Sequence, residues 1–187
     1  VACDFWVDKE KSMNSKGIEI ANTDRNGVCR VIFGDFKSGQ NHEIYPGTWD
    51  GTSCSYVYKN SKKSTIWNTK KSRNVIDAEL EVLTGLADLG PTGLDHECSE
   101  WKNSKNGIPK SRKIMVKSGH KKADFEPFLV GGSNKDPHFY LCRQKIKAGK
   151  WLYSYQTEAR RCIFGKIEKR QLVGNSQVVA FNASCQK

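Results

Sequence analysis

Long hydrophobic runs are missing from this sequence. No apolar stretch approaches the ~20 residues that a membrane-spanning helix needs, and hydrophobic residues make up only 37% of the chain. No segment keeps a sustained 3.6-residue period, which disfavours an all-helical fold. The chain begins Val-Ala-Cys rather than with Met, and its start lacks the charged-then-apolar pattern of a signal peptide. We therefore expect a mature chain whose signal peptide has been removed, with no membrane span.

Motifs of catalysis and metal binding are also missing. The sequence contains no Cys-x-x-Cys, His-Glu-x-x-His, Gly-x-Ser-x-Gly or glycine-rich phosphate loop. His96 lies in Asp95-His96-Glu97-Cys98, which allows a Cys/His or metal site, but a plain surface segment is the preferred interpretation. The other histidines, His42, His120 and His138, are scattered. We expect no enzyme, no catalytic residue, no metal and no cofactor.

Basic residues outnumber acidic ones, giving a net charge of +11. This excess predicts an anionic partner, such as nucleic acid, an acidic glycan, an acidic lipid surface or an acidic protein; a merely solvated basic surface is the alternative. Residues 59–73 and 101–122 hold no acid and are expected to be long loops. Each contains a tryptophan, Trp67 or Trp101, that could stack on bases or sugars. The expected basic patch comprises Lys62, Lys63, Lys70, Lys71, Lys110, Arg112, Lys113, Lys117, Lys121 and Lys122.

The two halves of the chain repeat one pattern. Cys29-Arg30 lies on an apolar run and is followed by Cys54; Cys142-Arg143 lies on another and is followed by Cys162. Such repetition indicates one structural unit used twice. We place the first unit at residues 1–85, an acidic Gly- and Pro-containing linker at 86–100, and the second unit at 101–187.

Short β-branched or aromatic runs predict strands, and the fold class is therefore mostly β. We expect two related antiparallel β-sandwich-like units with long basic loops. Residues 78–83 fit either a strand or a helical turn and a half. The other expected strands are 29–33, 55–58, 125–130, 138–142, 150–155, 162–167 and 178–181.

Seven cysteines favour disulfide bonds in an oxidising compartment, and hence secretion. Because the repeat places two cysteines at equivalent positions in each unit, we expect one bridge within each: Cys29 with Cys54 and Cys142 with Cys162. Packed free thiols are the alternative. Cys3 and Cys185 lie near the two termini and could pair with each other. Cys98 is then left over and could join two chains as a homodimer.

The same positions resemble the DM9 repeat family, also described as natterin-like. The matching elements in the first half are Trp6, Asp24, Cys29-Arg30, Tyr45-Pro46-Gly47, Cys54 and Glu79–Leu83. Those in the second half are Trp101, Gly107-Ile108-Pro109, Gly131–Asn134, Tyr140–Arg143, Cys162–Phe164 and Val178-Val179. The resemblance implies paired β-sandwich units and, as in several members, carbohydrate recognition in immunity.

In that family an Asp accepts sugar hydroxyls and a Lys donates to them. Asp24 can supply the acceptor, whereas Thr48 stands where the donor Lys is expected. The expected ligand contacts are Asp24, Arg30, Asn134 and Arg143. For the two arginines, a salt bridge on the strand surface is the preferred alternative.

The sequence as a whole predicts a secreted, non-enzymatic, lectin-like protein that binds carbohydrate or an acidic glycan surface. Immunity or host interaction would be its setting. The alternative is a basic salivary- or venom-type effector that binds and inhibits an acidic protein or nucleic acid partner.

Overall fold

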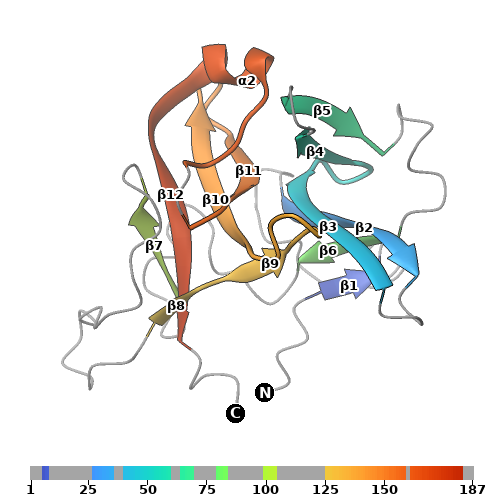
Figure 1. Cartoon of the computed structure of the whole chain (residues 1–187). Helices are drawn as coiled ribbons and strands as arrows, with labels where there is room; N and C mark the ends of the chain where they lie inside the picture. Colours follow the sequence, from blue (N-terminus) through green and yellow to red (C-terminus); the bar gives the residue numbers. More distant parts are fainter. Residues whose placement is uncertain are drawn as a thin grey trace.

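The computed structural model describes residues 6–8, 27–35, 40–59, 64–69, 79–83, 99–104, 125–158 and 161–182. Within these ranges the chain forms two antiparallel sheets and one short helix (Figure 1). The expected fold class is confirmed. In these ranges, no helix is long and apolar enough to cross a membrane.

The first sheet contains only strands from the first half of the chain. Its strand order is β1-β6-β2-β3-β4-β5. In chain order the strands are β1 (Trp6–Asp8), β2 (Gly27–Asp35), β3 (Gln40–Trp49), β4 (Cys54–Lys59), β5 (Ser64–Asn68) and β6 (Glu79–Leu83).

The second sheet contains only strands from the second half. Its main path is β11-β10-β12-β7, with β8 paired to β12 and β9 paired to β10. The strands are β7 (Ser99–Asn103), β8 (Phe125–Pro127), β9 (Leu129–Gly131), β10 (Phe139–Ile146), β11 (Trp151–Gln156) and β12 (Leu172–Asn182). The helix, α2 (Lys166–Gln171), directly precedes β12.

The two sheets repeat one strand order. The path β1-β6-β2-β3 of the first sheet corresponds to β7-β12-β10-β11 of the second. The pairing register also repeats, because Cys29 lies opposite Val82 and Cys142 lies opposite Val178. The internal repeat of the sequence is therefore a repeat of hydrogen-bonded architecture.

The outer strands extend this correspondence. Trp6 of β1 pairs with Leu83, and Trp101 of β7 pairs with Val179. Each partner lies one residue beyond the valine that faces the repeat cysteine of its half. The two tryptophans therefore occupy the same position in the two sheets.

Disulfide bonds join the repeat cysteines within each half, as expected from the sequence. Cys29 is bonded to Cys54 and Cys142 to Cys162, with a Cα–Cα distance of 5.9 Å in both. The predicted pairing is confirmed. The remaining predictions for cysteines, on Cys3, Cys98 and Cys185, lie outside the described residues.

The two sheets share their hydrophobic core. One cluster packs Tyr45 and Tyr56 of the first sheet with Phe139 and Tyr155 of the second. A second cluster packs Val28 with side chains from β7, β9, β10, β11 and β12. Since Tyr45 and Thr48 point to opposite faces of β3 and Thr48 hydrogen-bonds β11, both faces of this strand contact the second sheet.

Several expected elements differ from those observed. Residues 64–68 form β5 and residues 99–103 form β7, so neither basic tract is entirely a loop, and the end of the expected linker is a strand. Neither strand was predicted, because lysines or acids flank each of them in the sequence. Pairing with β4 and β12, respectively, holds the two strands in place. The expected strand 125–130 is two strands, β8 and β9.

The expected strand 162–167 is wrong. Residues 161–165 have no regular structure, and α2 follows. Lys, Glu, Arg and Gln all have good helix propensity, but one helical turn and a half is too short to produce a recognisable period. Strand β3 was not expected at all, since Pro46 interrupts it. Proline has no backbone N–H to donate to a neighbouring strand. Pro46 is tolerated because β4 pairs only with Gly47–Trp49, so no residue of β4 needs an N–H from Pro46.

Candidate binding surface

The loop between β9 and β10 is fastened to the first sheet. Ile44 of β3 and Gly132 exchange backbone hydrogen bonds, with N···O distances of 2.9 and 3.2 Å. A Cβ atom on Gly131 would collide with the Ile44 carbonyl, and one on Gly132 with the Pro137 carbonyl. Two glycines in succession are therefore needed for this close approach of backbones.

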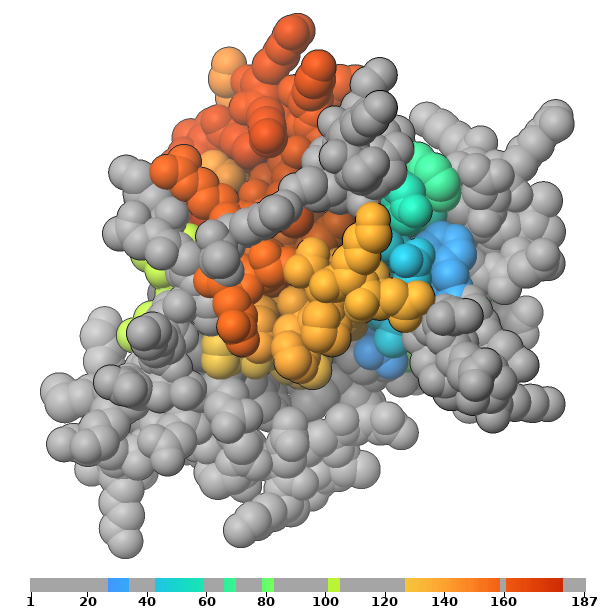
Figure 2. All heavy atoms as spheres, in the orientation of Figure 1, coloured from blue at the N-terminus to red at the C-terminus, as the bar shows by residue number. Residues whose placement is uncertain are grey.

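The tip of the same loop is a closed turn with outward-facing side chains. The Ser133 amide donates to the Asp136 carbonyl at 2.8 Å, and the Asp136 amide donates to the Ser133 hydroxyl at 3.2 Å. Asn134, Asp136 and His138 are nevertheless exposed. Figure 2 shows this segment, in yellow-orange, at the front of the molecule. The backbone of the loop is therefore held in place while these three side chains lie at the surface.

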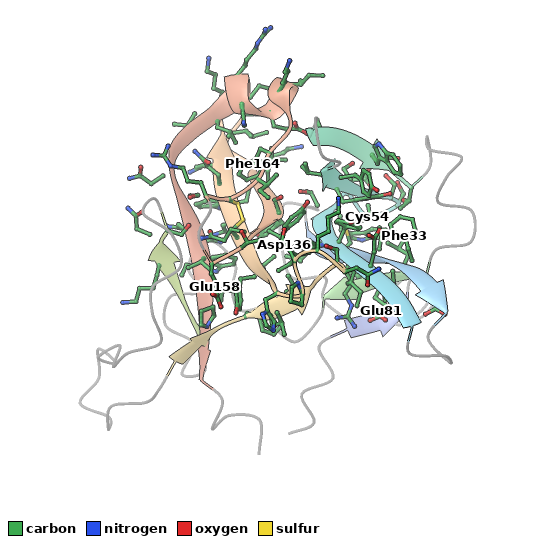
Figure 3. All side chains as sticks on the ribbon, viewed as in Figure 1. Phe33, Cys54, Glu81, Asp136, Glu158 and Phe164 are labelled. Carbon is green, nitrogen blue, oxygen red and sulfur yellow. A yellow bond between two sulfur atoms is a disulfide. The ribbon has the colours of Figure 1, made fainter. Side chains whose placement is uncertain are left out.

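Two further side chains continue this surface along the second sheet. The His138 ring stacks on Tyr140, with 6.3 Å between centroids. The Tyr140 hydroxyl donates to Glu158 Oε1 at 3.5 Å, and Glu158 is exposed beyond the end of β11. Figure 3 labels Asp136 and Glu158 on the side of the molecule that faces the viewer. We call Asn134, Asp136, His138, Tyr140 and Glu158 the loop surface.

The loop surface offers the chemistry that polyhydroxylated ligands require. Carboxylates accept hydrogen bonds, and an amide both donates and accepts. Tyrosine and histidine add flat rings with an apolar body and a polar edge, suited to the faces and hydroxyls of a sugar. Because the loop is anchored at both glycines, a ligand would not have to order it on binding.

Arg30, one expected ligand contact, forms an ion pair within its own sheet. Its Nη2 lies 2.9 Å from Glu81 Oε2, and the two side chains are only about a fifth exposed. Glu81 is the residue directly opposite Arg30 on β6. Arg30 therefore forms the salt bridge on the strand that was the preferred alternative to a ligand contact.

Arg143, the equivalent residue in the second sheet, is buried instead. Only 3% of it is exposed, and its guanidinium carbon lies 3.9 Å from the ring centroids of both Trp101 and Trp151. Its Nε donates to Gln177 Oε1 at 3.0 Å. Burial lowers the pKa of this guanidinium to about 10, with Tyr153 acting in the opposite direction. It therefore stays charged at neutral pH, out of reach of a ligand at the surface.

Thr48 uses its hydroxyl inside the molecule. The hydroxyl accepts from the Tyr153 amide at 3.0 Å and lies 3.4 Å from the Tyr153 carbonyl. These contacts join β3 to β11. At the position where a lysine donor would be expected, this chain has a group that links its two sheets.

Of the predicted site residues, only Asn134 lies on the loop surface. Asp24 and the expected basic patch, Lys62 to Lys122, lie outside the described residues. Asp136, His138, Tyr140 and Glu158 were not predicted from the sequence. The polar run Ser-Asn-Lys-Asp-Pro-His between two apolar strands was the available signal, whereas Glu158 is brought close only by the pairing of β10 with β11.

Within the described ranges, no group of three or more His, Cys, Asp or Glu side chains could hold a metal ion. Comparisons with protein-family models, with curated proteins and with solved structures found no match to this chain.

Proposed function

We propose that this chain is a secreted, non-enzymatic, lectin-like protein that binds carbohydrate through its loop surface. The observation that carries the proposal is the loop of residues 131–138, whose backbone is fixed to β3 while Asn134, Asp136 and His138 remain exposed. A rigid backbone with a mixed set of donors, acceptors and rings is the arrangement that selects hydroxyl groups by direction.

Three further features support this proposal. Two intramolecular disulfides favour an oxidising, extracellular setting. The resemblance of the sequence to the DM9 repeat family implies carbohydrate recognition and, through it, a role in immunity or host interaction. Thr48 occupies the position of the expected donor lysine, and its hydroxyl is hydrogen-bonded to Tyr153. The proposed sugar site is therefore the loop surface of the second half and not a lysine-based site in the first half.

A glycan array probed with the full, oxidised chain tests this function. We expect discrete sugar hits, and the double change Asn134→Ala/Asp136→Ala should weaken them at least about tenfold, because each removes a directed hydrogen bond. Asn175→Ala is the matched control, since Asn175 is also exposed but lies on β12, between the residues that pair with Lys145 and Arg143 near the hairpin end of β10. It should leave binding unchanged.

Two results would contradict the proposal. The first is an array without hits for the folded chain, and the second is sugar binding that the double variant retains. Retention on a heparin column with steep loss in salt, combined with an empty array, would instead favour the basic effector that binds an acidic protein or nucleic acid.

A further inference from the structure

One end of the second sheet carries a compact group of basic residues. The β10–β11 hairpin and the start of β12 meet there beside α2, at the top of Figure 1. We call residues 145–150 and 166–173 the basic tip. Its cationic side chains are all exposed: Lys145, Lys147, Lys150, Lys166, Lys169 and Arg170. Glu168, half-buried, is its one carboxylate.

The basic tip also exposes aliphatic side chains. Ile167 is 69% exposed and Val173 is 46% exposed. Only one other large hydrophobic residue is comparably exposed in the part of the chain that the structure describes, Leu129 at 50%. The basic tip thus exposes two aliphatic side chains together with six cations. This combination indicates a surface that binds a partner with both negative charge and an apolar part.

The basic tip is held in shape by backbone contacts. The Lys147 amide donates to the Gln171 carbonyl at 2.8 Å, which joins the hairpin to the end of α2. Lys145 pairs with Val173 across β10 and β12. The other end of α2 is fixed because Gly165 packs against Ile66 of β5 without room for a side chain. The side chains shown with nitrogen ends at the top of Figure 3 therefore project from one fixed platform.

We propose that the basic tip docks on the surface of an anionic lipid bilayer. The cations would face phospholipid head groups, while Ile167 and Val173 enter the boundary between head groups and acyl chains. A soluble polyanion matches the charge equally well but offers nothing to the aliphatic side chains. A bilayer supplies both, and this favours it as the partner.

This surface is separate from the loop surface. The loop precedes β10 and the hairpin follows it, so the two lie at opposite ends of an eight-residue strand, about 25 Å apart at the usual rise per residue. Bilayer docking and sugar binding can therefore be tested independently, and failure of one leaves the other standing.

Vesicle co-sedimentation of the full, oxidised chain tests the proposal. We expect binding to phosphatidylcholine vesicles that contain phosphatidylserine, and none to phosphatidylcholine alone. The triple change Lys166→Gln/Lys169→Gln/Arg170→Gln should weaken binding on the order of a hundredfold, because each cation near such a surface contributes roughly a factor of five. Glu168→Gln removes the opposing charge and should strengthen binding by a similar single factor.

Ile167→Ser tests the apolar part and should weaken binding without a change in charge. Leu129→Ser is its matched control, an equally large exposed aliphatic outside the tip. Arg161→Gln, an exposed cation away from the tip, is the control for a single Lys169→Gln. Circular dichroism of each variant establishes that it is folded.

Folded chain that stays in the supernatant with anionic vesicles would overturn the proposal. So would full binding by the triple variant. Binding that Ile167→Ser leaves unchanged, and that a soluble polyanion abolishes, would identify a charge-only partner and equally refute bilayer docking.

Discussion

Arg30 and Arg143 show how one sequence position acquires two roles. Both follow a repeat cysteine and both bond the side chain opposite them on the neighbouring strand, Glu81 or Gln177. In the first sheet that neighbour is a carboxylate and the pair is partly exposed. In the second sheet the partner is neutral, and the charged guanidinium lies against the rings of two tryptophans in cation–π contacts.

We predict that Arg143→Ala lowers the free energy of unfolding by about 2–4 kcal/mol. The change removes two desolvated cation–π contacts and leaves a cavity between the indoles. Denaturant unfolding followed by tryptophan fluorescence measures it. Arg30→Ala is the control at the equivalent position, where loss of a partly exposed ion pair should cost less than about 1 kcal/mol. Equal losses for the two variants would contradict the different roles.

At the scale of elements, the turn between β3 and β4 depends on one carboxylate. Asp50 accepts from the amides of Thr52 and Ser53 at 2.8 and 2.7 Å, and from both of their hydroxyls at 3.0 Å. Burial would raise the pKa of Asp50, but these hydrogen bonds outweigh it and lower the pKa. Gly51, at φ 97°, supplies the left-handed residue of the same turn.

We predict that Asp50 makes the free energy of unfolding depend on acid pH. A carboxyl whose folded pKa lies below its unfolded value stabilises the protein above the unfolded pKa, near 4. That stabilisation is lost as pH falls through the folded value. Asp50→Asn should therefore be less stable than the unsubstituted chain at neutral pH by about 1 kcal/mol, and the difference should shrink below pH 4.

Denaturant unfolding at a series of pH values measures this difference. Ser53→Ala keeps the carboxylate but removes one of its donors, so its pH dependence should fall between those of the other two proteins. Parallel profiles for all three would show that Asp50 has no special ionisation in this turn.

At the scale of the whole molecule, the two repeats are joined by their packing. Tyr155 donates its hydroxyl hydrogen to the Val57 carbonyl at 3.1 Å, and its ring stacks on Phe139 with 4.2 Å between centroids. Phe139 in turn contacts Tyr45 of the first sheet. Since each sheet buries part of the other, we expect neither to unfold alone.

We predict a single unfolding transition in which far-ultraviolet circular dichroism and tryptophan fluorescence coincide. Phe139→Ala should shift both probes together and cost about 3–5 kcal/mol, because it opens a cavity between the sheets. Leu129→Ala, an exposed change on the adjacent β9, should shift neither appreciably. Two separate transitions would indicate that the halves are independent domains.

One residue of the candidate site was predicted from the sequence, and the others were not. Asn134 was predicted because Gly131–Asn134 matches one element of the DM9 repeat pattern. Tyr140 and Glu158 are 18 residues apart, and only the register of β10 against β11 brings them together. The basic tip was not predicted because its cations come from two segments about 20 residues apart in sequence, which only the contact between Lys147 and Gln171 brings together. The expected strands 150–155 and 162–167 included only Lys150 and Lys166.

The sequence by itself determined the mostly β fold, the two related halves and the disulfide within each. These follow from local alternation and from cysteines at equivalent positions, which a single chain displays directly. The tertiary structure alone decided that the halves share a core, that Thr48 joins them, and that Arg143 is buried where Arg30 is not. Such outcomes depend on which side chains face each other across strands distant in sequence, and no local pattern encodes that.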